Sequence, residues 1–208
     1  GSYGLGFYST FKETMAIDGE PADISFKPQG YLFLSDRGDS SQMRSNYETQ
    51  TANGVGAELL EQGDLKKRFP SVNFDDVEIG VLTPDDAWID PHAAMMGFRR
   101  MARHLGVEYR KDRVVDWEGD GAAARHVTLE SGQIISAKTF VLAAGAWSGE
   151  IAAMLDWHVP IRPMSRQTHY FLCKAEIEPL PFLKCETDLA FRPEGAGFTG
   201  GKPDWSVG

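Results

Sequence analysis

The segment 139–148, with the sequence TFVLAAGAWS, combines residue types that could form a ligand-binding edge. Phe140, Val141 and Leu142 form an apolar run, which is typical of a strand covered on both faces. Small residues follow at 143–146, and small side chains at a strand end let a ligand approach the backbone closely. We therefore predict a buried strand, a small-residue turn and a helix start, an arrangement that favours polar ligands. A tightly packed turn without a ligand is the alternative.

Two glycine patterns imitate a dinucleotide-binding fingerprint, and both lack the elements that the fingerprint needs. Residues 4–9 have a serine at the position of the last glycine, and no strand precedes them. Residues 195–200 match G-x-G-x-x-G, but Pro203 stands where a helix should begin. Lys202, followed by proline, also fails as the lysine of a phosphate loop. We interpret residues 195–200 as a hairpin turn.

Composition narrows the functional classes. The chain has 208 residues, of which 42% are hydrophobic, so it can bury a core. Its net charge of -9 argues against nucleic-acid binding, which needs basic patches. Cys173 and Cys185 match no zinc spacing, so we predict no metal site and two reduced thiols in a cytoplasmic protein. No apolar run is long enough for a membrane span, and no signal peptide is recognised.

The clearest element that could position this chemistry is a helix that begins at Asp90-Pro91. Asp90 is predicted as the N-cap and Pro91 as the first helical residue, while Gly106 ends the helix. Its apolar residues recur at helical spacing, and we predict that they face the core. They are Ala94, Met95, Phe98, Met101, Ala102 and Leu105.

The remaining elements are short and indicate an α+β (mixed α/β) fold with antiparallel sheets. Helices are predicted within 3–16 and over 39–53 and 64–69. Strands are predicted in two pieces of 24–34 and over 55–60, 77–82, 107–109, 113–117, 125–130, 133–137, 167–173 and 189–192, with a loop at 176–181.

Several motifs occur in an order that resembles a known family. Residues 29–34 resemble its early G-x-L-x-L strand, residues 88–91 its hydrophobic-Asp-Pro helix start, and residues 191–195 its aromatic-Arg strand. Residues 141–148 resemble its second flavin-contacting segment. The family is the superfamily of D-amino-acid oxidase, glycine oxidase and sarcosine oxidase. Within it, the chain resembles most the mitochondrial FAD-dependent oxidoreductases linked to complex I assembly, and the dimethylglycine dehydrogenases.

This resemblance implies a division of the chain by function. Residues 1–89 and 158–208 would form two parts of an antiparallel-sheet substrate-binding domain, and residues 90–157 a partial FAD-binding domain. The backbone of Val114 would contact the adenine of FAD. The residues that would line the dinucleotide are Ala143, Ala144, Gly145, Ala146 and Trp147. A core position is the alternative for Trp147.

The resemblance also implies a substrate side. Arg192 lies on a strand where relatives carry an arginine, and a guanidinium binds a carboxylate in bidentate fashion. Phe191 and Tyr170 would form walls of the pocket, with positions in the core as the alternative. His169 is a weaker candidate for a base. No catalytic residue is assigned, because the flavin itself carries amine oxidation.

The family also has a G-x-G-x-x-G turn upstream and a C-terminal part that closes the active site, and this sequence contains neither. We therefore expect an internal fragment that does not retain FAD by itself. In its intact form the protein is expected to oxidise a C–N bond of a small amine or amino acid. Two alternatives stay open, namely a non-catalytic assembly or interaction protein and a 2-hydroxy-acid oxidase on the same fold.

Overall fold

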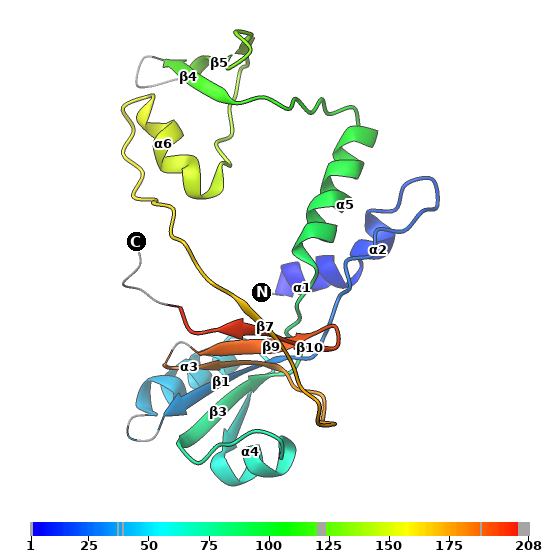
Figure 1. Cartoon of the computed structure of the whole chain (residues 1–208), viewed down its shortest axis with the longest axis vertical. Helices are drawn as coiled ribbons and strands as arrows, with labels where there is room; N and C mark the ends of the chain where they lie inside the picture. Colours follow the sequence, from blue (N-terminus) through cyan, green and yellow to red (C-terminus); the bar gives the residue numbers. More distant parts are fainter. Residues whose placement is uncertain (1, 37, 39, 120–123, 188, 204–208) are drawn as a thin grey trace. The chain divides into compact units, whose positions relative to one another are not determined.

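The structure is a computed structural model that describes residues 2–36, 38, 40–119, 124–187 and 189–203. The chain divides into two compact units (Figure 1). The first unit comprises residues 1–107 and 167–204, and the second consists mainly of residues 108–166. Both units contain helices and strands, so the predicted mixed α/β class is confirmed.

Within the described residues, the first unit is built on a seven-stranded sheet with the order β2-β3-β1-β8-β9-β10-β7. Its strands are β1 (Tyr31–Asp36), β2 (Glu58–Glu61), β3 (Val77–Thr83), β7 (His169–Leu172), β8 (Phe182–Cys185), β9 (Ala190–Glu194) and β10 (Gly197–Gly201). Neighbouring strands are antiparallel except for β1 and β8, which are parallel. We expected an antiparallel sheet, and the structure shows a mixed one. Its central strand, β8, was not predicted.

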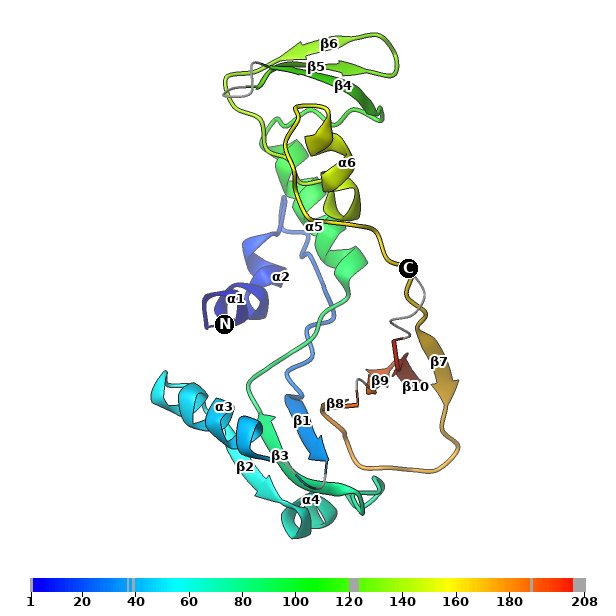
Figure 2. The same ribbon diagram turned by 90° about the vertical axis from the view of Figure 1, so that its left-hand side faces the viewer.

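One face of this sheet carries the main hydrophobic core. Leu32 and Leu34 of β1 and Leu183 of β8 point into it, because side chains alternate between the faces of a strand. Helix α4 (Gln62–Arg68) covers this core with the fully buried Leu65. The opposite face presents Phe33 to helix α3 (Ser41–Ala52). Figure 2 shows α3 and α4 beside the β2–β3 end of the sheet.

Helix α5 (Pro91–His104) begins as predicted. Oδ1 of Asp90 accepts hydrogen bonds from the backbone N–H groups of His92 (2.8 Å) and Ala93 (3.0 Å). These bonds satisfy two amides that have no partner within the first turn of the helix. The aspartate-proline pair therefore fixes the point at which the chain leaves the sheet and becomes helical.

The apolar stripe of α5 is only partly buried, which corrects the prediction of a core-facing stripe. Ala94 is buried and Met101 is half-buried against helices α1 (Ser2–Ser9) and α2 (Phe11–Thr14). Met95, Phe98 and Leu105 are exposed, although the ring of Phe98 still stacks on an aromatic ring of α1 and meets one of α2 edge to face. The stripe is wider than the surface that these two short helices offer within the first unit.

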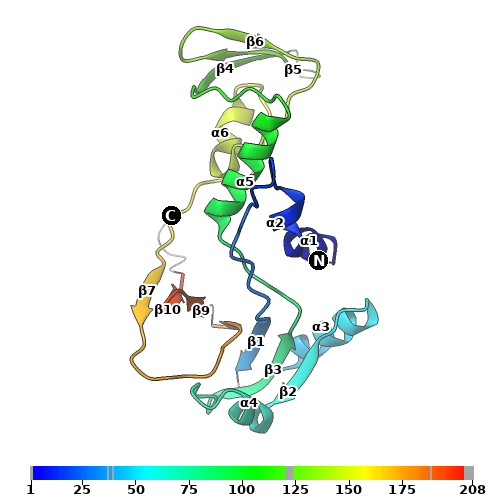
Figure 3. The same cartoon turned by 90° about the vertical axis from the view of Figure 1, so that its right-hand side faces the viewer.

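The second unit is a small sheet with a helix against it (Figure 3). Its described strands are β4 (Val114–Gly119), β5 (Ala124–Leu129) and β6 (Ile134–Ser136), and a 3-10 turn η1 (Gly145–Trp147) leads into α6 (Ser148–Ala153). Trp117 and Val127 of the sheet pack in one core with Leu155, which follows α6. The strand expected at 107–109 is irregular chain.

The segment before the small-residue turn is not the buried strand that we expected. Residues 139–144 have no regular secondary structure. Phe140 and Leu142 are half-buried against the core of the second unit, whereas Val141 is 85% exposed between them. The apolar run is thus covered on one face only, by the core of the second unit, and it belongs to neither of the described sheets.

Two further features concern cellular context. None of the described helices has the length and hydrophobicity needed to cross a bilayer. Cys173 and Cys185 are both free, and Cys173 is exposed. Burial raises the pKa of the half-buried Cys185 thiol, and the carboxylates of Asp36 and Asp76 raise it further.

We predict that Asp90→Ala lowers the free energy of unfolding by about 1 kcal/mol, because it leaves the first amides of α5 without an acceptor. Asp90→Ser keeps an acceptor at the cap and should recover most of this loss. Urea unfolding followed by circular dichroism measures both. Equal losses in the two variants would contradict the capping role.

We also predict that Gly200→Ala destabilises the chain by at least about 2 kcal/mol. A Cβ at Gly200 would overlap the carbonyl oxygen of Ala190 and lie 2.5 Å from Cα of Phe191, both in β9. Gly63→Ala is the matched control, since a Cβ there meets nothing within 4 Å and alanine favours the helix α4. The two variants should shift the urea midpoint in opposite directions.

Candidate functional site

Strand register decides which side chains of the sheet share a face. Leu183 of β8 points into the core and pairs with Phe191 of β9, so both lie on the core face. Phe182 and Arg192, one residue away from each, therefore point to the opposite face. Tyr31 pairs with Phe182 and points the same way. This opposite face is called the ligand face below.

The same register continues to both sides of Arg192. Thr199 of β10 pairs with Arg192 and also with Tyr170 of β7. On the other side, Tyr31 pairs with Thr83 of β3. A continuous row therefore crosses the ligand face, and it consists of Thr83, Tyr31, Phe182, Arg192, Thr199 and Tyr170.

The structure separates the three residues that we expected on the substrate side. Arg192 of β9 and Tyr170 of β7 share the ligand face, but β10 lies between their strands, which are therefore about 10 Å apart. Phe191 lies on the core face, where its ring meets those of Phe171 and Phe198. Phe191 is half-buried against the core, which is the alternative position given for it above. Its role as a pocket wall stays a prediction. His169 is exposed at the start of β7.

Arg192 is held by three groups. Its Nη1 forms an ion pair with the carboxylate of Glu194 and donates to the carbonyl oxygen of Pro193 at 3.3 Å. Its guanidinium carbon lies 5.6 Å from the ring centroid of Trp88, a cation–π distance. Trp88 is fixed in turn by two backbone hydrogen bonds with Lys27, of 2.9 and 3.2 Å. Trp88 and Glu194 were not predicted as site residues.

Tyr31 adds a neutral hydroxyl to the ligand face. Burial raises the pKa of its phenol, the carboxylate of Asp86 raises it further, and Arg192 offsets part of this rise. Asp86 is itself fixed by a hydrogen bond from Oγ1 of Thr83. A phenol is protonated near neutral pH even at its ordinary pKa, and the raised pKa of Tyr31 strengthens this, so its hydroxyl can donate a hydrogen bond.

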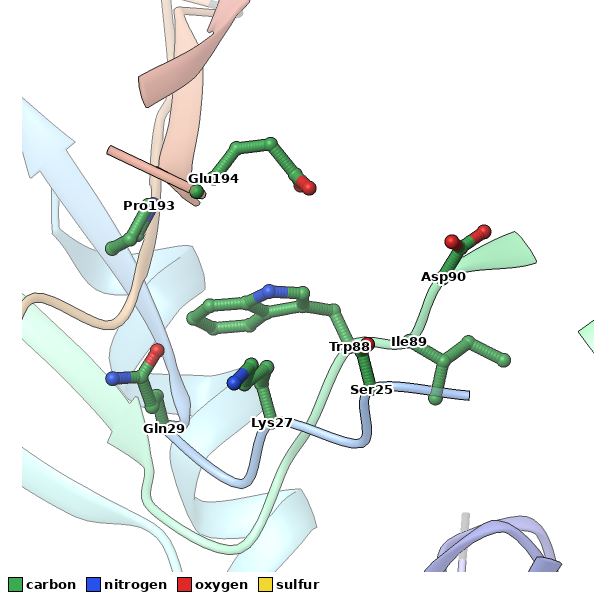
Figure 4. Close-up of a pocket in the computed structure, with 9 residues that line it drawn as sticks. Ser25, Lys27, Gln29, Trp88, Ile89, Asp90, Pro193 and Glu194 are labelled. Carbon is green, nitrogen blue, oxygen red and sulfur yellow. The ribbon is translucent and has the colours of Figure 1, made fainter. Parts of the chain in front are cut away.

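A pocket of about 450 Å³ opens beside Trp88 (Figure 4). In Figure 4 the indole of Trp88 lies between Lys27 and Gln29 on one side and Pro193 and Glu194 on the other. Cavities of this size accommodate small organic molecules. The described residues that line it are Ser25, Lys27, Gln29, Trp88, Ile89, Asp90, Pro193, Glu194 and Gly195. It therefore offers donors from a lysine and an amide and an acceptor from a carboxylate.

The residues expected to contact a dinucleotide lie in the second unit. Val114 packs against the same core as Phe140 and Leu142, which lead into the small-residue turn. Ala143 is exposed, and a Cβ added at Gly145, with φ +57°, would meet nothing within 4 Å. Trp147 is 61% exposed, so its alternative position in the core is excluded in this unit.

This turn fits one flank of FAD, because its backbone is open to a flat ligand. The pyrophosphate of FAD needs a different kind of site, namely a glycine turn between a strand and a helix. Residues 4–9 lie within and at the end of helix α1, and residues 195–200 form the β9–β10 hairpin that we predicted. Neither glycine pattern can therefore bind the pyrophosphate in the usual way.

Comparison with known proteins gives a consistent result. A family model described as "DAO: FAD dependent oxidoreductase" matches residues 3–205. The FAD-dependent oxidoreductase domain-containing protein 1 of Xenopus laevis is 27% identical over 87% of this chain and 42% of its own length. The 4-methylaminobutanoate oxidase (formaldehyde-forming) of Paenarthrobacter nicotinovorans is 27% identical over 90% of this chain and 22% of its own length.

Among solved structures, glycine oxidase from Geobacillus kaustophilus superimposes with a TM-score of 0.79 at 15% identity. The match covers 98% of this chain and 55% of that structure, so it establishes a shared fold. The chain spans less than half of the length of the two curated relatives above. Because the family model covers nearly every residue, the chain belongs to the DAO family of FAD-dependent oxidoreductases.

Proposed function

We propose that the whole protein is an FAD-dependent oxidoreductase that oxidises a C–N bond of a small amine or amino acid. The family match over residues 3–205 carries this proposal. The reaction class is supported by a relative whose name specifies the oxidation of a methylated amino acid. In this proposal, residues 1–89 and 158–208 contribute to substrate binding and residues 90–157 to FAD binding.

The chain's own residues would divide the work between cofactor and substrate. Val114 and the turn 143–147 would hold FAD through exposed backbone, and the cofactor, when bound, accepts the hydride of the oxidised carbon. Arg192 would bind a substrate carboxylate, with Tyr170 on the same face of the sheet. Substrate positioning and the exclusion of water are then the main contributions of the polypeptide.

A non-catalytic role is the second candidate. The relatives named "FAD-dependent oxidoreductase domain-containing protein 1" carry a name that specifies no substrate. Such a protein would keep the fold, and FAD as a structural group, while its surface serves assembly. No specific observation favours a 2-hydroxy-acid oxidase. We therefore do not propose this activity, and hydroxy acids serve as controls in the experiment below.

We predict that the purified 208-residue chain is colourless. The turn in the second unit offers one flank of an FAD site, and neither glycine pattern lies between a strand and a helix. Absorbance between 350 and 500 nm, which is the flavin region, measures retained cofactor. A yellow preparation that releases FAD on denaturation would contradict this expectation.

We predict that the whole protein, expressed with the coding sequence on both sides of this chain, bleaches its flavin anaerobically with small amines or N-methyl amino acids. Reduction by the substrate removes the flavin absorbance, because the cofactor accepts the hydride. Lactate and glycolate serve as hydroxy-acid controls. Bleaching by hydroxy acids alone, or by no compound at all, would refute C–N oxidation.

A further inference from the structure

Arg192 and Glu194 form an internal ion pair at the edge of the pocket. They are two residues apart on β9 and therefore point to the same face of the strand. The side chain of Arg192 is 21% exposed and that of Glu194 is 48% exposed. Glu194 is among the described residues that line the pocket, and Arg192 is not. A ligand in the pocket thus meets the carboxylate before the guanidinium.

The guanidinium is already engaged in this state. Trp88 lies against it, Pro193 accepts a hydrogen bond from Nη1, and Glu194 neutralises its charge. A carboxylate that enters the pocket finds donors in Lys27 and Gln29, but it is repelled by Glu194. It reaches Nη1 of Arg192 only if Glu194 moves aside.

Among the described residues that line the pocket, the other two charged side chains are Lys27 and Asp90, whose opposite charges offset each other. Asp90 accepts two hydrogen bonds from the first turn of α5, and Asp86 accepts one from Thr83. Tyr31 is uncharged near neutral pH, and its raised pKa strengthens this. The ion pair is therefore the part of the pocket that a ligand carboxylate can rearrange, since it contains both a cation and an anion that can be displaced from it.

We propose that Glu194 is an internal carboxylate that occupies the Arg192 anion site and selects zwitterionic ligands. The proposal rests on the function given above, in which Arg192 receives the substrate carboxylate. When a ligand carboxylate replaces Glu194 on Arg192, the pocket holds one more negative charge, which Lys27 does not balance because Asp90 already offsets it. An ammonium group on the same ligand restores the balance, because it can pair with Glu194.

The charge arithmetic separates three classes of ligand. With a zwitterion, the ligand carboxylate pairs with Arg192 and its ammonium with Glu194. Arg192 and Lys27 balance Glu194 and Asp90, so a simple carboxylate leaves one negative charge in excess and a simple amine leaves one positive charge in excess. The site therefore favours a small amino acid over an isosteric acid or an isosteric amine, and Glu194 is the residue that determines this preference.

Three isosteric probes of different charge test the proposal on the 208-residue chain. N,N-dimethylglycine is the zwitterion, 3-methylbutanoate the anion, and N,N-dimethylglycinamide, in its protonated form, the cation. Dissociation constants are measured from the indole N–H signal of Trp88 in nitrogen-15 NMR spectra, which Trp88→Phe assigns. We expect the zwitterion to bind about 1.5-fold to fivefold more tightly than either isostere, which is the range for an exposed ion pair.

Glu194→Gln should remove this preference. It leaves Arg192 without an internal carboxylate, so 3-methylbutanoate should bind this variant about 1.5-fold to fivefold more tightly than it binds the unmodified chain. Arg192→Gln should abolish the benefit of a ligand carboxylate. Glu108→Gln is the matched control, because Glu108 and Arg110 form the same pair two residues apart in the second unit. It should change none of the three constants.

The proposal is overturned if Glu194→Gln leaves the order of the three probes unchanged, or if Glu108→Gln reproduces its effect. It is also overturned if no probe binds to the chain or to its Glu194→Gln variant. The outcome is distinct from that of the flavin-bleaching experiment. If the flavin is bleached but Glu194→Gln leaves the order of the three probes unchanged, only the role of Glu194 is refuted. If the probes bind in the expected order but no compound bleaches the flavin, only the oxidase reaction is refuted.

Discussion

The parallel ladder between β1 and β8 is the interaction on which the candidate site depends. It joins strands from distant parts of the sequence, and it pairs Tyr31 with Phe182. The next ladder then brings Arg192 into the same row. A slip of one residue between β1 and β8 would bury Tyr31 in the core and turn Leu32 towards the ligand face. The buried leucines on one face thus determine which polar groups meet on the other.

Trp88 is positioned by constraints on both of its sides. Its backbone pairs with Lys27 before the indole meets Arg192, and two residues later Asp90 caps helix α5. The chain between sheet and helix is therefore fixed at both ends over a very short distance. This explains why an otherwise irregular segment can serve as a wall of the pocket and as a support for a guanidinium.

Local chemistry in the sequence was sufficient for several elements. Asp90-Pro91 predicted the start of α5 because the cap involves only the next residues, and the glycine-rich segment was correctly interpreted as the β9–β10 hairpin. Strand β8 has four residues, and its parallel partner lies far away in the sequence, so no local pattern indicates it. The run at Phe140–Leu142 suggested burial on both faces, which depends on covering elements that the second unit does not supply.

The candidate site was predictable to a smaller extent. Arg192 was identified, and Glu194 could have been added, since residues two apart on a strand share a face. Trp88 could not have been identified from the sequence, because its contact with Arg192 depends on the register of the whole sheet. The roles of Val114, Tyr170, Phe191 and the turn 143–147 stay predictions that rest on family resemblance.

The composition of the pocket lining has a consequence for the handling of protons. Among the described residues that line it there is no histidine and no cysteine, the side chains that ordinarily exchange protons near neutrality. The nearby phenol of Tyr31 holds its proton near neutral pH, and burial raises its pKa further. Among these described residues, the groups that could accept a proton from a bound ammonium are therefore the carboxylates of Asp90 and Glu194.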